Sequence, residues 1–303
     1  MKAIKKSLIF FVLPVFLPVF FATPLHGEES RVVFIVTNPG VTPYKEIIEG
    51  IRNKLKVPSL MIDISHDGGD KPFLTSSHFG VIAIGEKGWV EAKRMFPDSP
   101  KVAVFLDNEG ICLKKLNIKC QVISLFPDPG RAFSVFKSLF PNKKRIGVLF
   151  DKSTEKSYRK LVEAKGLSLG LSIITREAED ETEVVKAITA LAQESEAFFY
   201  LPQSIFTFTT QKFLFETFLI KKKAVFSTSY RAAHQGALFS TIITNKRLGE
   251  KVAESIEKFM KNENHNSQGL VYLSPEKIVC NKNIAKNLEI PLSKIDKIVG
   301  DCQ

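Results

Sequence analysis

The sequence predicts an α/β protein of two lobes, each a doubly wound parallel sheet with helices on both faces. Two segments that begin 145 − 31 = 114 residues apart carry this pattern, Arg31–Asn38 (RVVFIVTN) and Arg145–Asp151 (RIGVLFD). Each joins a basic residue, an apolar run with β-branched side chains and a polar end. A continuous apolar run is what a parallel strand covered on both faces requires. The repeat therefore predicts two successive α/β units.

The chain begins with the pattern of a secretion signal. Three lysines precede an uncharged apolar stretch, Leu8–Ala22, and the small residue Gly27 lies ahead of an acidic pair. An uncleaved membrane anchor is the alternative. The stretch holds two prolines and falls short of the roughly 20 residues that a spanning helix needs. We therefore expect residues 1–27 to be a signal peptide cleaved after Gly27, which places the mature protein in the periplasm or another extracytoplasmic space.

Length and charge fit two ordinary domains without a nucleic-acid partner. Removal of the signal leaves 303 − 27 = 276 residues and a formal charge of 11 − 3 = +8. Two domains of about 130 residues accommodate this length. The only dense basic runs, Lys143–Arg145 and Lys221–Lys223, lie between a predicted helix and a predicted strand, where solvated turns are expected. No nucleic-acid motif accompanies them.

Four cysteines in an exported chain predict disulfides, with three connectivities open. Cys112 and Cys120 flank a short basic link and are the first predicted pair. Zinc is the weaker alternative because the sequence has no CxxC motif and no histidine at ligand spacing. We expect no metal site. The other two cysteines are Cys280 and Cys302.

Strand-like and amphipathic segments alternate along the mature chain. Strands are predicted at Val32–Thr37, Leu60–Ile64, Gly80–Ile84, Val102–Leu106, Val122–Phe126, Ile146–Phe150, Ser172–Thr175, Ala197–Leu201, Ala224–Ser227 and Leu238–Ile243. Helices are predicted at Tyr44–Leu55, Lys87–Met95, Gly130–Leu139, Glu155–Lys165, Glu181–Gln193, Thr207–Ile220 and Arg247–Lys261. Such alternation implies mostly parallel sheets, and ten strands fit two sheets of about five better than one.

The predicted lobes meet at a proline-rich crossover. Two prolines around an Asp in Phe126–Pro129 cannot continue a central strand. Val271–Val279 is strand-like but holds Pro275, which predicts an edge or connecting strand. Asn281 then caps a short helix that ends at Leu288. The predicted lobes are residues 31–126 plus 245–275, and residues 127–244 plus 276–303.

An ordered set of motifs from about Gln121 to Pro291 resembles a known family. It reads FPDPGRAFSVFKSLFPNKKRIGVLFD, a strand ending YLPQS, KKKAVFSTSYRAAHQGALFSTIITNKRLGEKVAESIEKFM, and IVCNKNIAKNLEIPL. This set resembles the ABC transporter substrate-binding family related to tryptophan/tyrosine uptake proteins, with the type I periplasmic-binding-protein fold. The resemblance implies two lobes joined by a multi-strand hinge, which close over a small molecule and deliver it to an inner-membrane ABC permease. We expect a monomer without a cofactor.

Two departures from the family pattern leave a second function open. The chain reads Ile84-Gly85-Glu86 where such proteins often present Thr or Ser, and Gln203-Ser204 where they present an acidic residue or Asn. The alternative is a periplasmic sensor or interaction module of the same fold, which regulates a membrane partner without delivering solute.

Candidate ligand residues follow from the rule that solutes bind beyond the carboxyl ends of parallel strands. Asn38 has an ordinary turn as its alternative role, and Asp151 a helix cap. The run Ser227–Tyr230 has more hydroxyls than a turn requires. The full set is Thr37, Asn38, Glu86, Asp107, Asn108, Asp151, Gln203, Ser204, Ser227, Thr228, Ser229 and Tyr230.

Catalysis is not expected. His66, Asp67 and Asp70 lie in a Gly-rich stretch that indicates a loop. The sequence has no nucleophile elbow, no HExxH and no phosphate-binding glycine loop.

Overall fold

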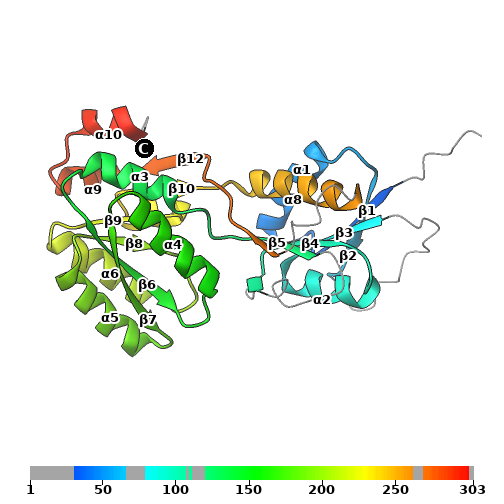
Figure 1. Cartoon of the computed structure of the whole chain (residues 1–303), viewed down its shortest axis with the longest axis horizontal. Helices are drawn as coiled ribbons and strands as arrows, with labels where there is room; N and C mark the ends of the chain where they lie inside the picture. The colour runs from blue at the N-terminus through cyan, green and yellow to red at the C-terminus, as the bar shows by residue number, and fades with distance from the viewer. Residues whose placement is uncertain (1–30, 66–78, 107–108, 111–119, 262–268, 300–303) are drawn as a thin grey trace, which may run out of the picture. The chain divides into compact units, whose positions relative to one another are not determined.

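The computed structural model describes residues 31–65, 79–106, 109–110, 120–261 and 269–299 (Figure 1). These residues form two six-stranded sheets with helices packed on their faces. The α/β fold with two lobes is therefore confirmed. Every pairing between strands is parallel except one in the second sheet, where Lys277–Cys280 runs antiparallel to Phe239–Ile242.

The first sheet, sheet A, has the strand order β11-β5-β4-β3-β1-β2. Its strands are β1 (Val32–Thr37), β2 (Ser59–Asp63), β3 (Phe79–Ile84), β4 (Lys101–Val104), β5 (Cys120–Ile123) and β11 (Gly269–Val271). Helices α1 (Thr42–Lys54) and α8 (Asn245–Met260) share one apolar core with it, and α2 (Gly85–Met95) shares another. The continuous apolar strands are thus covered on both faces, as their sequences require.

The second sheet, sheet B, has the strand order β12-β10-β9-β8-β6-β7. Its strands are β6 (Arg145–Asp151), β7 (Ser172–Ala178), β8 (Ala197–Tyr200), β9 (Ala224–Ser227), β10 (Phe239–Ile242) and β12 (Lys277–Cys280). Its helices are α3 (Gly130–Leu139), α4 (Lys156–Ser168), α5 (Glu181–Glu194), α6 (Phe208–Ile220), α7 (Tyr230–Gln235), α9 (Lys282–Asn287) and α10 (Leu292–Val299). One core joins the sheet to α3, α4, α9 and α10, and the other joins it to α5, α6 and α7.

The chain passes between the two sheets three times, after β5, after β10 and after β11. The first passage includes Phe126, whose ring stacks on Tyr158 of α4 at 5.0 Å between centroids. The Tyr158 hydroxyl donates to the carbonyl of Pro127 at 3.1 Å. Tyr272, in the third passage, packs on the same Tyr158 ring. One buried tyrosine therefore anchors two of the three connections. The lobe limits at residues 126, 244 and 275 stay a prediction.

The single strand predicted over Val271–Val279 is wrong, because two strands in different sheets occupy this range. β11 pairs with β5 of sheet A, and β12 pairs antiparallel with β10 of sheet B. Residues 272–276, with Pro275, connect them. The edge position is confirmed, since β11 and β12 each end a sheet. The helices α7 and α10 were not predicted.

No free cysteine is found in the described part of the chain, where Cys120 and Cys280 are both disulfide-bonded. Cys112 and Cys302 lie outside the described residues. Pairing of Cys112 with Cys120 stays a prediction.

Lys101, at the start of β4, is fully buried. Its ammonium donates to the carbonyls of Phe96, Pro97 and Ser99, which follow the end of α2. The side chain therefore supplies donors to three carbonyls of the turn that joins α2 to β4. Burial lowers the pKa of Lys101 to about 8, against the opposing effect of Asp98.

We expect Lys101→Met to lower the free energy of unfolding by about 1–2 kcal/mol near neutral pH, because buried carbonyls lose their donor. The variant also changes the pH dependence. Between pH 8 and 10 an unfolded lysine holds its proton while a folded Lys101 with a pKa of about 8 releases it. Stability of the wild type therefore rises with pH in this window relative to the variant. Urea denaturation of both proteins at several pH values measures the two effects. If the free energies of unfolding of wild type and variant change with pH in parallel between pH 8 and 10, the predicted pH dependence is contradicted.

Candidate functional site

Asp151 ends β6 at the carboxyl edge of sheet B and is 8 % exposed. Its Oδ1 accepts hydrogen bonds from the Ser153 backbone N–H at 2.8 Å and from the Ser153 hydroxyl at 2.7 Å. Its Oδ2 accepts from the exposed hydroxyl of Ser204 at 3.1 Å. The helix-cap alternative for Asp151 is wrong, because Glu155 occupies the N-cap of α4. Asp151 and Ser204 come together at one position of the edge.

Gln203 connects the ends of β6 and β8. Its Oε1 accepts from the Asp151 backbone N–H and from the Thr154 hydroxyl, both at 2.7 Å. Its Nε2 donates to the carbonyl of Leu149 at 2.9 Å. Both ends of the amide are thus engaged with the protein itself. This geometry gives Gln203 a direct means of positioning Asp151.

Arg159 of α4 holds the same loop from the other side. Its guanidinium donates to the carbonyls of Asp151 at 2.9 Å, Lys152 at 2.9 Å and Thr154 at 3.1 Å. It also pairs with Glu177 of β7. The loop after β6 is therefore fixed before any ligand arrives.

Burial by itself raises the pKa of Asp151, but the hydrogen bonds from Ser153 and Ser204 and the charge of Arg159 outweigh it, and the pKa is lowered. The carboxyl group is therefore an anion at neutral pH. An anion with an exposed hydroxyl beside it favours hydrogen-bond donors and positively charged groups on a ligand.

We expect Asp151→Asn to lower the free energy of unfolding by about 1 kcal/mol at pH 7, since charged hydrogen bonds are replaced by neutral ones. Because the pKa of Asp151 is lower in the folded state, its contribution is present above the unfolded pKa and is lost as pH falls through the folded value. The wild type should therefore lose more stability than the variant between pH 5 and 3. Equal losses in urea denaturation would contradict this.

Ser227–Tyr230 follows β9 at the same edge of sheet B. The Ser227 side chain is fully buried, and its hydroxyl accepts from the Ser229 backbone N–H at 3.1 Å. Thr228 and Ser229 are half-buried. Tyr230 begins α7, is 52 % exposed and packs on His234 with 4.7 Å between ring centroids. Of this run, Tyr230 presents the largest accessible surface to a ligand.

Three predicted residues lie at the carboxyl edge of sheet A. Thr37 ends β1 with a fully buried side chain, and its hydroxyl has no hydrogen-bond partner among the described residues. The Asn38 side chain accepts from the Gly40 backbone N–H at 3.0 Å, so its turn alternative is confirmed. Glu86 is half-buried in the first turn of α2. Two further candidates, Asp107 and Asn108, lie outside the described residues.

Two aromatic residues at this edge were missed by sequence reasoning. Tyr44 of α1 packs edge-on against Phe105, with 5.5 Å between centroids. A Cβ atom at Gly85 would lie 2.3 Å from the Tyr44 hydroxyl oxygen, so only glycine fits there. Phe105 has φ +62°, a left-handed conformation that is rare for a bulky residue. Backbone strain of this kind concentrates at functional sites.

Metal-binding clusters and membrane-spanning helices are both absent from the described part of the chain. No group of three or more His, Cys, Asp or Glu side chains there is placed to hold a metal ion. None of the helices in the described ranges has both the length and the apolar character needed to cross a bilayer.

Solved structures share this fold at low sequence identity. A conserved domain protein from Vibrio cholerae matches with a TM-score of 0.59 and 15 % identity, over 91 % of this chain and 100 % of that one. An ABC domain in complex with L-Trp from Streptococcus pneumoniae matches with a TM-score of 0.56 and 21 % identity, over 90 % of this chain and 99 % of that one. The third is the ligand-free, open structure of a substrate binding protein with adhesive properties from Clostridium difficile. It matches with a TM-score of 0.58 and 14 % identity, over 86 % of this chain and 94 % of that one. These likenesses show the fold.

Sequence comparison supplies the family. No curated protein matches the chain. The model of the family described as ABC transporter substrate binding protein matches residues 131–297, which is 297 − 131 + 1 = 167 residues and more than half of the 303. The matched range contains all six strands of sheet B, its carboxyl edge with Asp151, Gln203 and Tyr230, and α8. The chain therefore belongs to the ABC transporter substrate-binding protein family.

Proposed function

We propose that this protein is an exported receptor that captures a small molecule between its two lobes and delivers it to an ABC permease. Membership of a substrate-binding family supports solute binding. The observation that carries the proposal to a site is the fixed carboxyl edge of sheet B, where Asp151 is held as an anion beside the exposed Ser204 hydroxyl and Tyr230 is exposed beyond the end of β9.

The mechanism that we propose is closure of the lobes on the solute. Contacts from the edge of sheet B, with the half-buried Glu86 and Tyr44 at the edge of sheet A, favour the closed state over the open one in proportion to their differential affinity. The permease then recognises the closed, loaded receptor. The protein acts as a monomer in the space outside the cytoplasm, after removal of residues 1–27, and carries out no catalysis.

A thermal-shift screen against amino acids, nucleobases and small peptides tests solute binding. A specific solute raises the melting temperature because it binds only the folded state. Tyr230→Ala and Ser204→Ala should then weaken that solute at least tenfold, which is about 1.4 kcal/mol. Leu167→Ala is the matched control, since Leu167 is an exposed residue far from this edge in α4. A folded protein that binds none of these solutes would overturn the proposal.

A sensor or interaction module of the same fold is the second candidate. The observation that favours it is the Gln203 amide, whose groups already bind the protein and leave one polar residue fewer for a solute. Neighbouring genes discriminate the two functions. A permease and an ATPase beside this gene support delivery, whereas a sensor kinase or an outer-membrane receptor supports regulation.

A further inference from the structure

The amino-terminal edge of sheet B, at the opposite end of the strands from Asp151, gathers cations from distant parts of the chain. Lys144 and Arg145 lead into β6, and Lys221–Lys223 leads into β9. Because β12 is antiparallel, its end at Cys280 also lies here, and α9 follows it. The Lys222 ammonium donates to the carbonyl of Asn287 at 2.6 Å, which joins the two turns. We name as the basic edge Lys143, Lys144, Arg145, Lys221, Lys222, Lys223, Lys286 and Lys294.

Carboxylates do not balance this charge. Glu196 accepts from the backbone N–H groups of Lys144 and Arg145 at 2.9 and 3.0 Å, and Glu289 pairs with Lys222 at 3.2 Å. Lys144, Lys221 and Lys286 form no ion pair within the residues that the structure describes.

The cations also repel one another. Burial lowers the pKa of Lys223, and Lys221, Arg145 and Lys143 lower it further, against the opposing effect of Glu196. This mutual repulsion is relieved when an anionic partner approaches the basic edge.

Two exposed aliphatic side chains project at the same edge. Ile220 ends α6, directly before Lys221, and is 82 % exposed; Leu167 near the end of α4 is 76 % exposed. They are the two most exposed large hydrophobic side chains of the described part. The turn after Leu167 leads to Ser172, whose N–H donates to the Lys144 carbonyl at 2.8 Å. Lysines and projecting aliphatic residues thus share one edge.

We propose that the basic edge, with Ile220 and Leu167, docks on the headgroups of an anionic lipid bilayer. Seven of its eight cations are lysines, which suit a diffuse anionic surface, whereas bidentate recognition of one planar anion favours arginine. Exposed aliphatic side chains enter the boundary between headgroups and acyl chains. Docking here leaves the Asp151 edge free, because it lies at the opposite end of the same strands. The proposal does not depend on which solute is bound.

Vesicle flotation of residues 28–303 tests this, since the apolar N-terminal segment would itself bind lipid. The vesicles are phosphatidylcholine alone, or phosphatidylcholine with about 30 % phosphatidylglycerol. We expect binding to the anionic vesicles only, and its loss when salt is raised from about 0.05 to 0.5 M.

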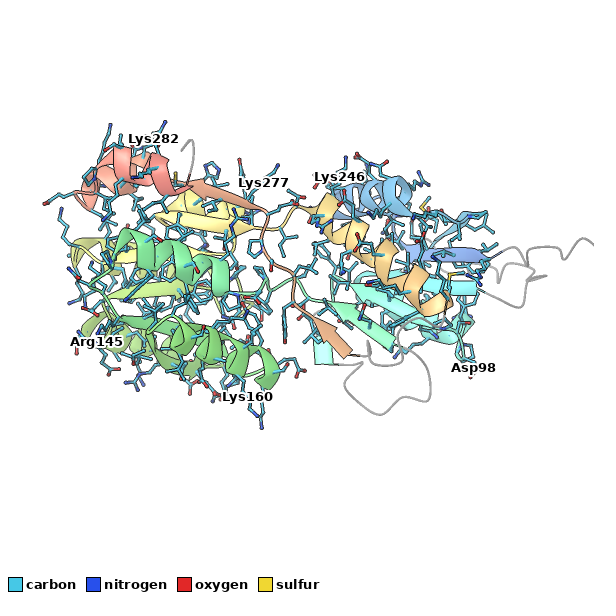
Figure 2. All side chains as sticks on the ribbon, turned by 45° about the horizontal axis from the view of Figure 1, so that its top comes forward. Asp98, Arg145, Lys160, Lys246, Lys277 and Lys282 are labelled. Atoms are coloured by element: carbon cyan, nitrogen blue, oxygen red, sulfur yellow. The ribbon has the colours of Figure 1, made fainter. Side chains whose placement is uncertain are left out.

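The decisive variant is Lys144→Glu, Lys221→Glu, Lys286→Glu, made together. One lysine near an anionic surface contributes roughly fivefold to the binding constant, so the triple variant should bind at least a hundredfold more weakly. Lys160→Glu, Lys186→Glu, Lys212→Glu is the matched control, with the same charge change on exposed residues of α4, α5 and α6 (Figure 2 labels Lys160 and Arg145). Equal loss of binding in both triple variants, binding to neutral vesicles, or binding to neither kind of vesicle would overturn the proposal.

A separate double variant, Ile220→Ser with Leu167→Ser, tests the aliphatic side chains at unchanged charge. It should weaken binding to the anionic vesicles. Unchanged binding would show that these two side chains do not enter the bilayer.

Discussion

Gly249→Ala is expected to lower the free energy of unfolding by about 3 kcal/mol, the upper end of what overpacking costs. Gly249 of α8 faces α1 so closely that an added Cβ atom would lie 2.1 Å from the carbonyl oxygen of Ile47. Gly50 of α1 is its counterpart, with a Cβ atom 2.1 Å from the carbonyl oxygen of Lys246. Both obstacles are backbone atoms, which cannot rotate away. The helices must separate, which loosens the core that they share with sheet A.

Gly166→Ala in α4 is the matched control for Gly249→Ala. A Cβ atom there would be too close only to the side chain of Ile173, at 2.4 Å, and this half-buried side chain is able to move, whereas the Leu171 carbonyl oxygen lies at an ordinary 3.8 Å. Alanine also gains about 1 kcal/mol of helix propensity over glycine. We expect a change within about 1 kcal/mol in chemical denaturation. Equal stability of the two variants would contradict the close helix contact.

The double variant Gly50→Ala, Gly249→Ala tests whether both glycines belong to one close contact between α1 and α8. Once one Cβ atom has separated α1 from α8, the second finds space already made. The double variant should therefore lose less free energy of unfolding than the sum of the two single losses. Strict additivity would show that the two glycines act at independent positions.

The sequence predicted the fold wherever the signal was local. β1 and β9 have the predicted limits, and so does α3, because each is a short apolar or amphipathic run with a clear boundary. Asn281 caps α9 through bonds to the two N–H groups at Asn283 and Ile284. Local reasoning failed at Val271–Val279, where one apolar segment supplies strands to two sheets. Pro275 indicated a break but not that the chain changes sheet there.

The site was less predictable because its contacts are long-range. Strand ends nominated Asp151, Gln203 and Ser204, and the structure brings these three together. The aromatic contact of Tyr44 with Phe105 joins residues 61 positions apart, since 105 − 44 = 61. Phe105 carries no sign of a left-handed backbone, which glycine or asparagine would have given. Whether these residues bind solute stays a prediction.

Gln203→Ala is expected to lower the free energy of unfolding by about 2–3 kcal/mol, even without solute. The Asp151 N–H and the Leu149 carbonyl lose the amide that joins β6 to the end of β8, and each unsatisfied group costs about 1–3 kcal/mol. Ser204→Ala, next in the chain, is the matched control. Its exposed hydroxyl makes one bond to Asp151, so we expect a loss below about 1 kcal/mol.

Solute affinity then distinguishes positioning from direct contact by Gln203. If Gln203 acts through Asp151, Gln203→Ala lowers stability and affinity together, because the loop after β6 is released. If it contacts solute itself, the variant lowers affinity while the ligand-free protein keeps its stability. Gln203→Glu sharpens the distinction, since it keeps an acceptor for the Asp151 N–H but loses the donor to Leu149 and adds a second anion beside Asp151. We expect it to be at least as unstable as Gln203→Ala. A stable Gln203→Glu protein with altered solute preference would show that Gln203 lies in the ligand contact and that Arg159 alone suffices to fix the loop.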